Sequence, residues 1–206
     1  MNKKIIITVA VLLPSFWVAA DPVVTAEKEF AYVDTAAGKS SLAEPLVQQI
    51  SSASKIDEAR LLLQEGKAVQ AITSLESIER NTDSWELSFL LGTAYLLVGQ
   101  LDDASNALDY ALGLNARVAE IWVQRAAVEQ ERENAQAALQ LLQVALQINP
   151  NCAEIYLNAA YAYEHLEKTN AARAAYGQYL KLSAKGKQNG RLRRQVLSRI
   201  SQIGKE

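Results

Sequence analysis

Residues 101–111 read LDDASNALDYA, and similar stretches follow twice along the chain. They are AQAALQLLQVA at residues 135–145 and AARAAYGQY at residues 171–179. Aligning them produces a column of small residues at a step of 34: Ala104, Ala138 and Ala172. Self-similarity at a fixed period of this length is the signature of stacked structural repeats.

Three more columns keep the step of 34 residues: Leu108, Leu142 and Tyr176; Ser88, Trp122 and Tyr156; and Gly92, Ala126 and Ala160. A weaker copy precedes them at an offset of 33: Ala59, Leu62, Gly66, Ala71, Leu75 and Ile78. Turn-forming residues separate the periodic stretches, at 66–67, 99–100, 149–151 and 168–170. Because Gly permits positive φ after a helix and Pro prevents its continuation, each copy is predicted to be helix, turn, helix.

These columns resemble the tetratricopeptide-repeat (TPR) motif. The residues that match it are Leu91, Gly92, Tyr95, Ala104, Leu108 and Ala111 in one copy; Trp122, Ala126, Ala138, Leu142, Ala145 and Pro150 in the next; and Tyr156, Ala160, Tyr163, Ala172, Tyr176 and Tyr179 in the last. The resemblance implies an all-α fold, a right-handed superhelix of about four repeats over residues 52–184. We expect the repeats at 52–84, 85–118, 119–152 and 153–184.

The two ends of the chain differ from the repeats. Residues 1–20 carry Lys3 and Lys4 before an apolar run that closes on Ala20, which is typical of a secretory signal peptide. Cleavage after Ala20 is our interpretation, and an uncleaved N-terminal anchor is the alternative. Either way we expect an exported, periplasmic protein, tethered to the inner membrane in the anchored alternative.

Two further segments flank the repeats. Residues 21–51 are expected to hold a loose leader and most of a short helix, whose pattern runs over 41–54. Residues 185–206 are expected to form a basic helix that caps the last repeat with an apolar stripe. The stripe consists of Leu192, Val196, Leu197, Ile200 and Ile203.

Few side chains could carry chemistry, because the chain has one His, His165, and one Cys, Cys152. It also contains no Gly-rich phosphate loop, zinc-type Cys/His cluster or nucleophile motif. We therefore expect no enzyme activity, no metal and no cofactor. Cys152 is interpreted as a small buried apolar residue and His165 as a partly exposed residue near a helix end.

The resemblance implies that partners bind the concave face made by the first helix of each repeat. The residues expected there are Glu86, Phe89, Thr93, Leu97, Glu120, Val123, Ala127, Gln130, Glu154, Leu157, Tyr161 and Glu164. An apolar floor of Phe89, Val123, Leu157 and Tyr161 beside a row of glutamates suits a basic or amphipathic protein segment. The alternative is that the apolar residues only pack between helices and the glutamates are solvated.

The third repeat departs from the motif, because Arg125 and Glu129 stand where the family has Leu and Tyr. Their spacing of four residues places them on one helical face. Two interpretations remain open: a partly buried ion pair, or two charged groups that reach water from packed stems.

Charge divides the chain unevenly. Residues 21–180 hold 22 acidic and 11 basic residues, a net charge of −11, whereas residues 181–206 hold eight basic residues and one acidic residue, a net charge of +7. The basic tail is defined by Lys185, Lys187, Arg191, Arg193, Arg194 and Arg199. It could be a solvated face on the cap, or it could contact lipid headgroups or the acidic body of another copy.

Together these patterns predict a scaffold or adaptor that binds a protein segment in its groove and serves the assembly of a bacterial envelope machine such as a pilus or secretion system. The alternative is a self-associating subunit whose basic tail docks on the acidic body of the next copy. No nucleic acid partner is expected, and membrane contact is expected only through an uncleaved N-terminal segment.

Overall fold

The computed structural model describes residues 43–78, 83–183 and 190–203, with side chains described from residue 52 onward. Within these ranges the chain forms nine α-helices and no strand. In chain order they are α1 (Ala43–Gln64), α2 (Ala68–Glu76), α3 (Trp85–Leu97), α4 (Leu101–Leu114), α5 (Ala119–Glu131), α6 (Ala135–Ile148), α7 (Ala153–His165), α8 (Thr169–Leu182) and α9 (Gly190–Gln202). In the described part of the chain, none of these helices has the length and apolar character needed to cross a membrane.

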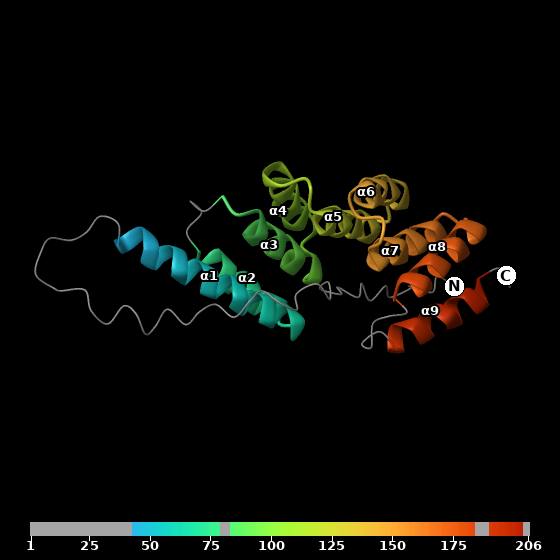
Figure 1. The fold of residues 1–206 in the computed structure, drawn as a ribbon, viewed down its shortest axis with the longest axis horizontal. Helices are drawn as coiled ribbons and strands as arrows, with labels where there is room; N and C mark the ends of the chain where they lie inside the picture. The colour runs from blue at the N-terminus through green and yellow to red at the C-terminus, as the bar shows by residue number, and fades with distance from the viewer. Residues whose placement is uncertain (1–42, 79–82, 184–189, 204–206) are drawn as a thin grey trace, which may run out of the picture.

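The helices pack as the pairs α1/α2, α3/α4, α5/α6 and α7/α8, and the pairs stack one after another along the molecule (Figure 1). The pairs α3/α4, α5/α6 and α7/α8 each lie within one predicted repeat range, whereas α1 begins at Ala43, before the predicted range 52–84. The predicted all-α superhelical repeat fold is confirmed. The helix predicted over 41–54 is not a separate element, because α1 runs without a break from Ala43 to Gln64. The proposed signal peptide and leader lie outside the described residues.

Small residues bring the two helices of a pair together. Ala126 and Ala160 are fully buried, and Gly92 occupies the equivalent position in α3. A Cβ atom on Gly92 would lie 2.6 Å from Cγ of Leu108 in α4. This close approach explains why a residue without a side chain stands there.

The turn inside each pair has the same backbone conformation. Gly66, Gly99, Glu133 and Glu167 are repeat-equivalent, and all have positive φ, at 76°, 78°, 60° and 56°. Each turn closes with paired hydrogen bonds to the preceding helix, such as Gly66 N to Leu63 O and Lys67 N to Leu62 O. This is the Schellman arrangement. The sequence predicted the two glycine turns but missed Glu133 and Glu167, because Glu is not a usual residue at positive φ.

The last helix, α9, covers the end of the stack. Val196 is 1% exposed and packs in the core cluster with Leu192, Ile200 and Ile203 beside it. Arg193 fixes the helix by donating hydrogen bonds to Leu180 O and Ser183 Oγ. The prediction that Leu197 belongs to the apolar stripe is wrong: it is exposed, because one residue after Val196 the helix has turned by about 100° toward solvent.

Candidate functional site

The predicted apolar floor lies inside the packed solenoid. Phe89 is 5% exposed, Val123 is 8% exposed and Leu157 is 3% exposed, and each belongs to a core cluster. The packing alternative expects this placement, because the first helices of successive repeats contact one another. Three further residues predicted for the face are also buried: Thr93, Ala127 and Gln130. The case for a binding face therefore depends on the residues that keep exposed surface.

The acidic row occupies one repeat position, the second residue of α3, α5 and α7. Glu86, Glu120 and Glu154 stand there, each half-buried. Arg60 of α1 pairs with Glu86 across the first junction between repeats. Within the described part of the chain, Glu120 and Glu154 have no ion-pair partner, although Cys152 Sγ lies 3.2 Å from Glu154 Oε2.

The reason for this difference lies one repeat further along the chain. The residues equivalent to Arg60 are Thr93 in α3 and Ala127 in α5. Thr93 is fully buried and donates to Phe89 O at 2.8 Å, and Ala127 has no polar atom in its side chain. Neither can neutralise the next glutamate. The second and third carboxylates of the row thus lack the arginine that the first one has.

An unpaired acceptor lies beside them. Gln124 is one helical turn after Glu120 on α5 and is 8% exposed, and its Oε1 has no hydrogen-bond partner among the described residues. A buried amide oxygen without a donor costs about 1–3 kcal/mol, so such groups normally have a partner. Because Oε1 is itself shielded from solvent, it is an internal acceptor and not part of the exposed surface.

At the C-terminal end, α9 supplies a cation to a different glutamate of the predicted face. Arg199 pairs with Glu164 of α7 at 2.5 Å, and its guanidinium lies 5.6 Å from the centre of the Tyr161 ring. Tyr161 in turn meets Tyr176 edge to face, with ring centroids 5.8 Å apart. The hydrogen bond to Glu164 raises the pKa of Arg199. Two predicted face residues, Tyr161 and Glu164, are therefore engaged by the chain's own cap.

The other basic residues of the tail divide into three groups. Arg191 and Arg194 are exposed, whereas Arg193 is held against α8 by its hydrogen bonds. Lys185 and Lys187 lie outside the described residues. The described tail thus presents two arginines to solvent and uses two within the chain.

Arg125 and Glu129 form the partly buried ion pair that the sequence left open. Arg125 contacts Glu129 at 2.5 Å and Asp109 at 2.8 Å, and Arg132 reaches Glu129 at 3.3 Å. The side chain of Glu129 is only 10% exposed. Burial alone would raise the pKa of Glu129, but the hydrogen bond and charge of Arg125, with Asn134 and Arg132, hold it below its ordinary value.

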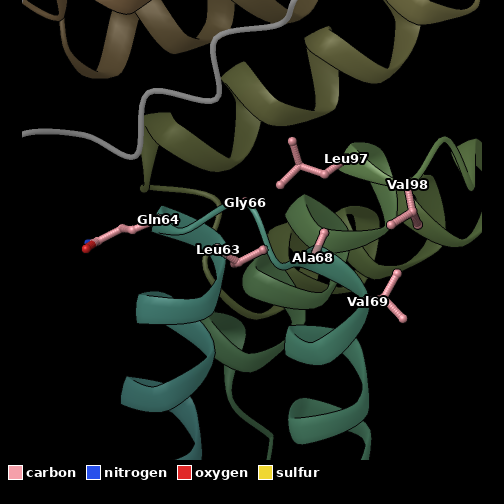
Figure 2. A pocket seen from close by; sticks show the side chains of 7 residues that line it. All are labelled: Leu63, Gln64, Gly66, Ala68, Val69, Leu97 and Val98. Carbon is pink, nitrogen blue, oxygen red and sulfur yellow. The ribbon is translucent and has the colours of Figure 1, made fainter.

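One edge of the solenoid carries the last residue of each first helix, namely Gln64, Leu97, Glu131 and His165. Leu97 keeps 39% of its surface exposed and is the only apolar member of this row in the described chain. It lines a pocket of about 350 Å³ that lies between the α1–α2 turn and the end of α3 (Figure 2). Sequence analysis placed Leu97 on the face but missed this pocket.

His165 and Cys152, the remaining residues that could carry chemistry, have different surroundings. His165 is exposed at the end of α7, as expected. Burial, followed by the charge and hydrogen bond of Glu154, raises the pKa of the Cys152 thiol to about 12, so that it is protonated at neutral pH. Among the described residues, no group of three or more His, Cys, Asp or Glu is arranged to hold a metal ion.

No protein-family model matches the sequence, and no curated protein matches it. Solved structures do. A thermophilic TPR protein from Thermus thermophilus, TTC0263, is similar with a TM-score of 0.63 at 18% identity, over 74% of this chain and 80% of that one. MamA is similar with a TM-score of 0.57 at 20% identity, over 69% of this chain and 84% of that one.

The first TPR domain of human RPAP3 is similar with a TM-score of 0.50 at 16% identity, over 58% of this chain and 94% of that one. Likeness at these identities concerns the fold, and it agrees with the period of 34 residues and with the paired helices. The chain has the fold of the tetratricopeptide-repeat proteins.

Proposed function

We propose that this protein is a scaffold that binds a basic or amphipathic segment of another protein along the face formed by α3, α5 and α7. The TPR fold supports a role in protein–protein interaction. The observation that carries this proposal is that Glu120 and Glu154 have no arginine beside them in the described part of the chain, whereas Glu86 pairs with Arg60. A lysine or arginine of the partner would take the equivalent place.

Arginine suits these carboxylates, because it offers several donors in one plane. A neighbouring anionic residue of the partner would be repelled, which makes the face selective for basic segments.

We propose further that the protein acts outside the cytoplasm, in the assembly of an envelope machine. The lysines and the apolar run at the N-terminus support export. Cell fractionation with N-terminal sequencing of the purified protein tests this: a mature chain that begins at Asp21 in the periplasmic fraction is expected. Full-length protein in the cytosolic fraction would contradict it.

The groove is tested with a pair of variants that change charge equally. The double variant Glu120→Gln with Glu154→Gln removes the two carboxylates that lack an arginine. The control, Asp103→Asn with Glu133→Gln, removes two exposed acidic groups elsewhere. We expect the first variant to recover partners from envelope extract at roughly a tenth of the wild-type amount, because a charge-assisted contact contributes about 1.5–3 kcal/mol. The control should recover the wild-type amount.

The same experiment has a clear opposite outcome. If both variants stay folded by circular dichroism and recover the same partners equally, Glu120 and Glu154 do not bind those partners. Repeating the wild-type recovery at raised salt gives a second readout, since partly exposed ion pairs weaken with ionic strength.

A further inference from the structure

A second pocket, with a volume of about 530 Å³, lies at the first junction between repeats, among α2, α3 and α4. Leu75, Ile78, Leu87 and Leu91 give it a mainly apolar wall. None of its described lining residues belongs to the predicted partner face, so the two sites are separate. A mainly apolar pocket of this size with a few polar groups is the usual form of a small-molecule site.

The pocket lies where one repeat has a hydroxymethyl group and the following two repeats have a ring. Ser88 lines the pocket and occupies the column that holds Trp122 and Tyr156 in the next repeats. Those two rings reach back to the loop before their own helix. Trp122 Nε1 donates to Ala116 O at 2.8 Å, and the Tyr156 hydroxyl donates to Pro150 O at 3.0 Å. The side chain of Ser88 has no ring to place at the first junction.

The charge beside the pocket also differs from that of the second junction. Asp109 is the repeat-equivalent of Glu76, and Arg125 is the repeat-equivalent of Leu91. At the second junction, Arg125 Nε donates to Asp109 Oδ1 at 2.8 Å, so the chain itself supplies a cation to that carboxylate. At the first junction, Leu91 carries no charge, and Glu76 accepts a hydrogen bond from the neutral hydroxyl of Tyr95 at 2.6 Å.

The polar part of the lining is acidic and aromatic. Glu76 and Asp103 are both exposed carboxylates, and among the described lining residues none is basic. Neither carboxylate has an ion-pair partner within the described ranges. Tyr95 and Tyr110 bring two electron-rich rings to the same pocket, and such rings attract cations. The lining therefore favours a positively charged ligand.

We propose that this pocket binds a small aromatic amine, whose ring enters the apolar space beside Ser88 and whose protonated nitrogen pairs with Glu76. This activity goes beyond the binding of a protein segment along α3, α5 and α7. The apolar wall accepts a ring of either charge, whereas the two carboxylates repel an anion and attract a cation. The amine takes the place that the guanidinium of Arg125 takes beside Asp109 at the second junction.

The experiment titrates the full chain by isothermal calorimetry with four probes. Tryptamine has a ring and an amine, 3-methylindole has the ring alone, indole-3-acetate has a ring and a carboxylate, and butylamine has the amine alone. We expect tryptamine to bind about fivefold more tightly than 3-methylindole and at least tenfold more tightly than indole-3-acetate or butylamine. Folded protein that does not bind tryptamine, or binds indole-3-acetate equally well, overturns the proposal.

Two variants locate the ligand. Ser88→Trp places the residue of the second junction in the pocket and should weaken tryptamine binding tenfold or more, because the ring position is then occupied. Glu76→Gln keeps the test valid if Ser88→Trp does not fold, since Glu76 is exposed. It should weaken tryptamine binding about fivefold and leave the affinity for 3-methylindole unchanged. Wild-type affinity for tryptamine in Glu76→Gln contradicts the pairing with the amine.

The matched control for the carboxylate is Glu58→Gln. Glu58 is likewise exposed and accepts a hydroxyl hydrogen bond, from Ser74 at 3.0 Å, but it does not line the pocket. It should bind tryptamine as wild type does. The double variant Glu120→Gln with Glu154→Gln should also bind tryptamine normally, because it changes the partner face alone. An equal loss of tryptamine binding in Glu76→Gln and in either of these controls would overturn the site.

Discussion

The first and second junctions between repeats have equivalent positions but different side chains at them. At the first junction, Val69 and Val98 line an open pocket of about 350 Å³. At the second, Asp102 and Arg132 stand at these positions and join the two repeats by a hydrogen bond, and Arg132 also reaches Glu129 in the ion network of α5. A solenoid can therefore keep one packing scheme while a few side chains decide whether a junction is sealed or open.

The difference also separates stability from binding. Sealing a junction by charges stabilises it only while every charge keeps its partner, because a lone desolvated charge is costly. Leaving a junction open gives up packing contacts, and at the first junction it keeps Val69 and Leu97 exposed. Variants that convert one junction into the other, or that remove what distinguishes them, separate the two contributions.

The largest effect is expected when the sealed junction loses its central carboxylate. Glu129→Ala leaves Arg125 and Arg132 without their shared partner, and their side chains are only 16% and 31% exposed. We expect a loss of about 3 kcal/mol in the free energy of unfolding, measured by urea denaturation. The double variant Arg125→Leu with Glu129→Tyr installs the residues found at Leu91 and Tyr95, and should recover most of the loss. A double variant no more stable than Glu129→Ala would contradict the charge-pairing explanation.

A pH dependence follows from the same carboxylate. The folded-state pKa of Glu129 lies below its ordinary value, so its contribution is present above about pH 4.3 and is lost as pH falls through the folded-state pKa. Wild-type stability should therefore fall more steeply in acid than that of Glu129→Gln. Urea midpoints measured from neutral pH down to about pH 3 check this, and parallel curves would refute it.

A smaller effect is expected from opening the sealed junction. Arg132→Val removes the bridge to Asp102 and Leu101 and copies the first junction. Because Arg132 is partly exposed, we expect a loss of only about 1 kcal/mol. Asp102→Asn is the control, since Asp102 is 95% exposed and its removal should cost less than half as much. Equal losses would mean that the pair, and not the packed arginine stem, closes the junction.

The smallest effects concern the turns next to the two junctions. Gly66 and Glu133 are equivalent and both have positive φ. Glu133→Gly should raise the free energy of unfolding by about 0.5 kcal/mol, because glycine adopts this conformation without strain but loses more chain entropy. Gly66→Ala should lower it by about 1 kcal/mol. Thermal unfolding of both variants checks the opposite signs, and the same sign for both would contradict the role of φ.

Much of the fold follows from the columns of the repeat. Ala104, Ala138 and Ala172 lie where close packing requires small residues, and all three are fully buried. A period of 34 residues is a local property of the chain, so it can be found without coordinates. The cap helix was also predictable, because Leu192, Val196 and Ile200 show helical spacing.

The candidate site was less predictable. The position of Phe89 and Leu157 on the first helices was predicted, but their burial depends on how closely successive pairs stack, and the sequence does not contain that distance. The pairing of Arg60 with Glu86 joins residues 26 positions apart, and that of Arg199 with Glu164 joins residues 35 apart. Such contacts were not evident from spacing within one helix.

The sequence by itself determined that this chain repeats a helix pair, where the turns of the first two repeats fall, and that its body is acidic while its tail is basic. These properties depend on residue type and spacing along the chain, which are local. The tertiary structure decided which charges are already satisfied, which junction is sealed, and which apolar side chains keep surface for a partner. Those properties depend on neighbours from different repeats, whose distance and burial exist only after the pairs have stacked.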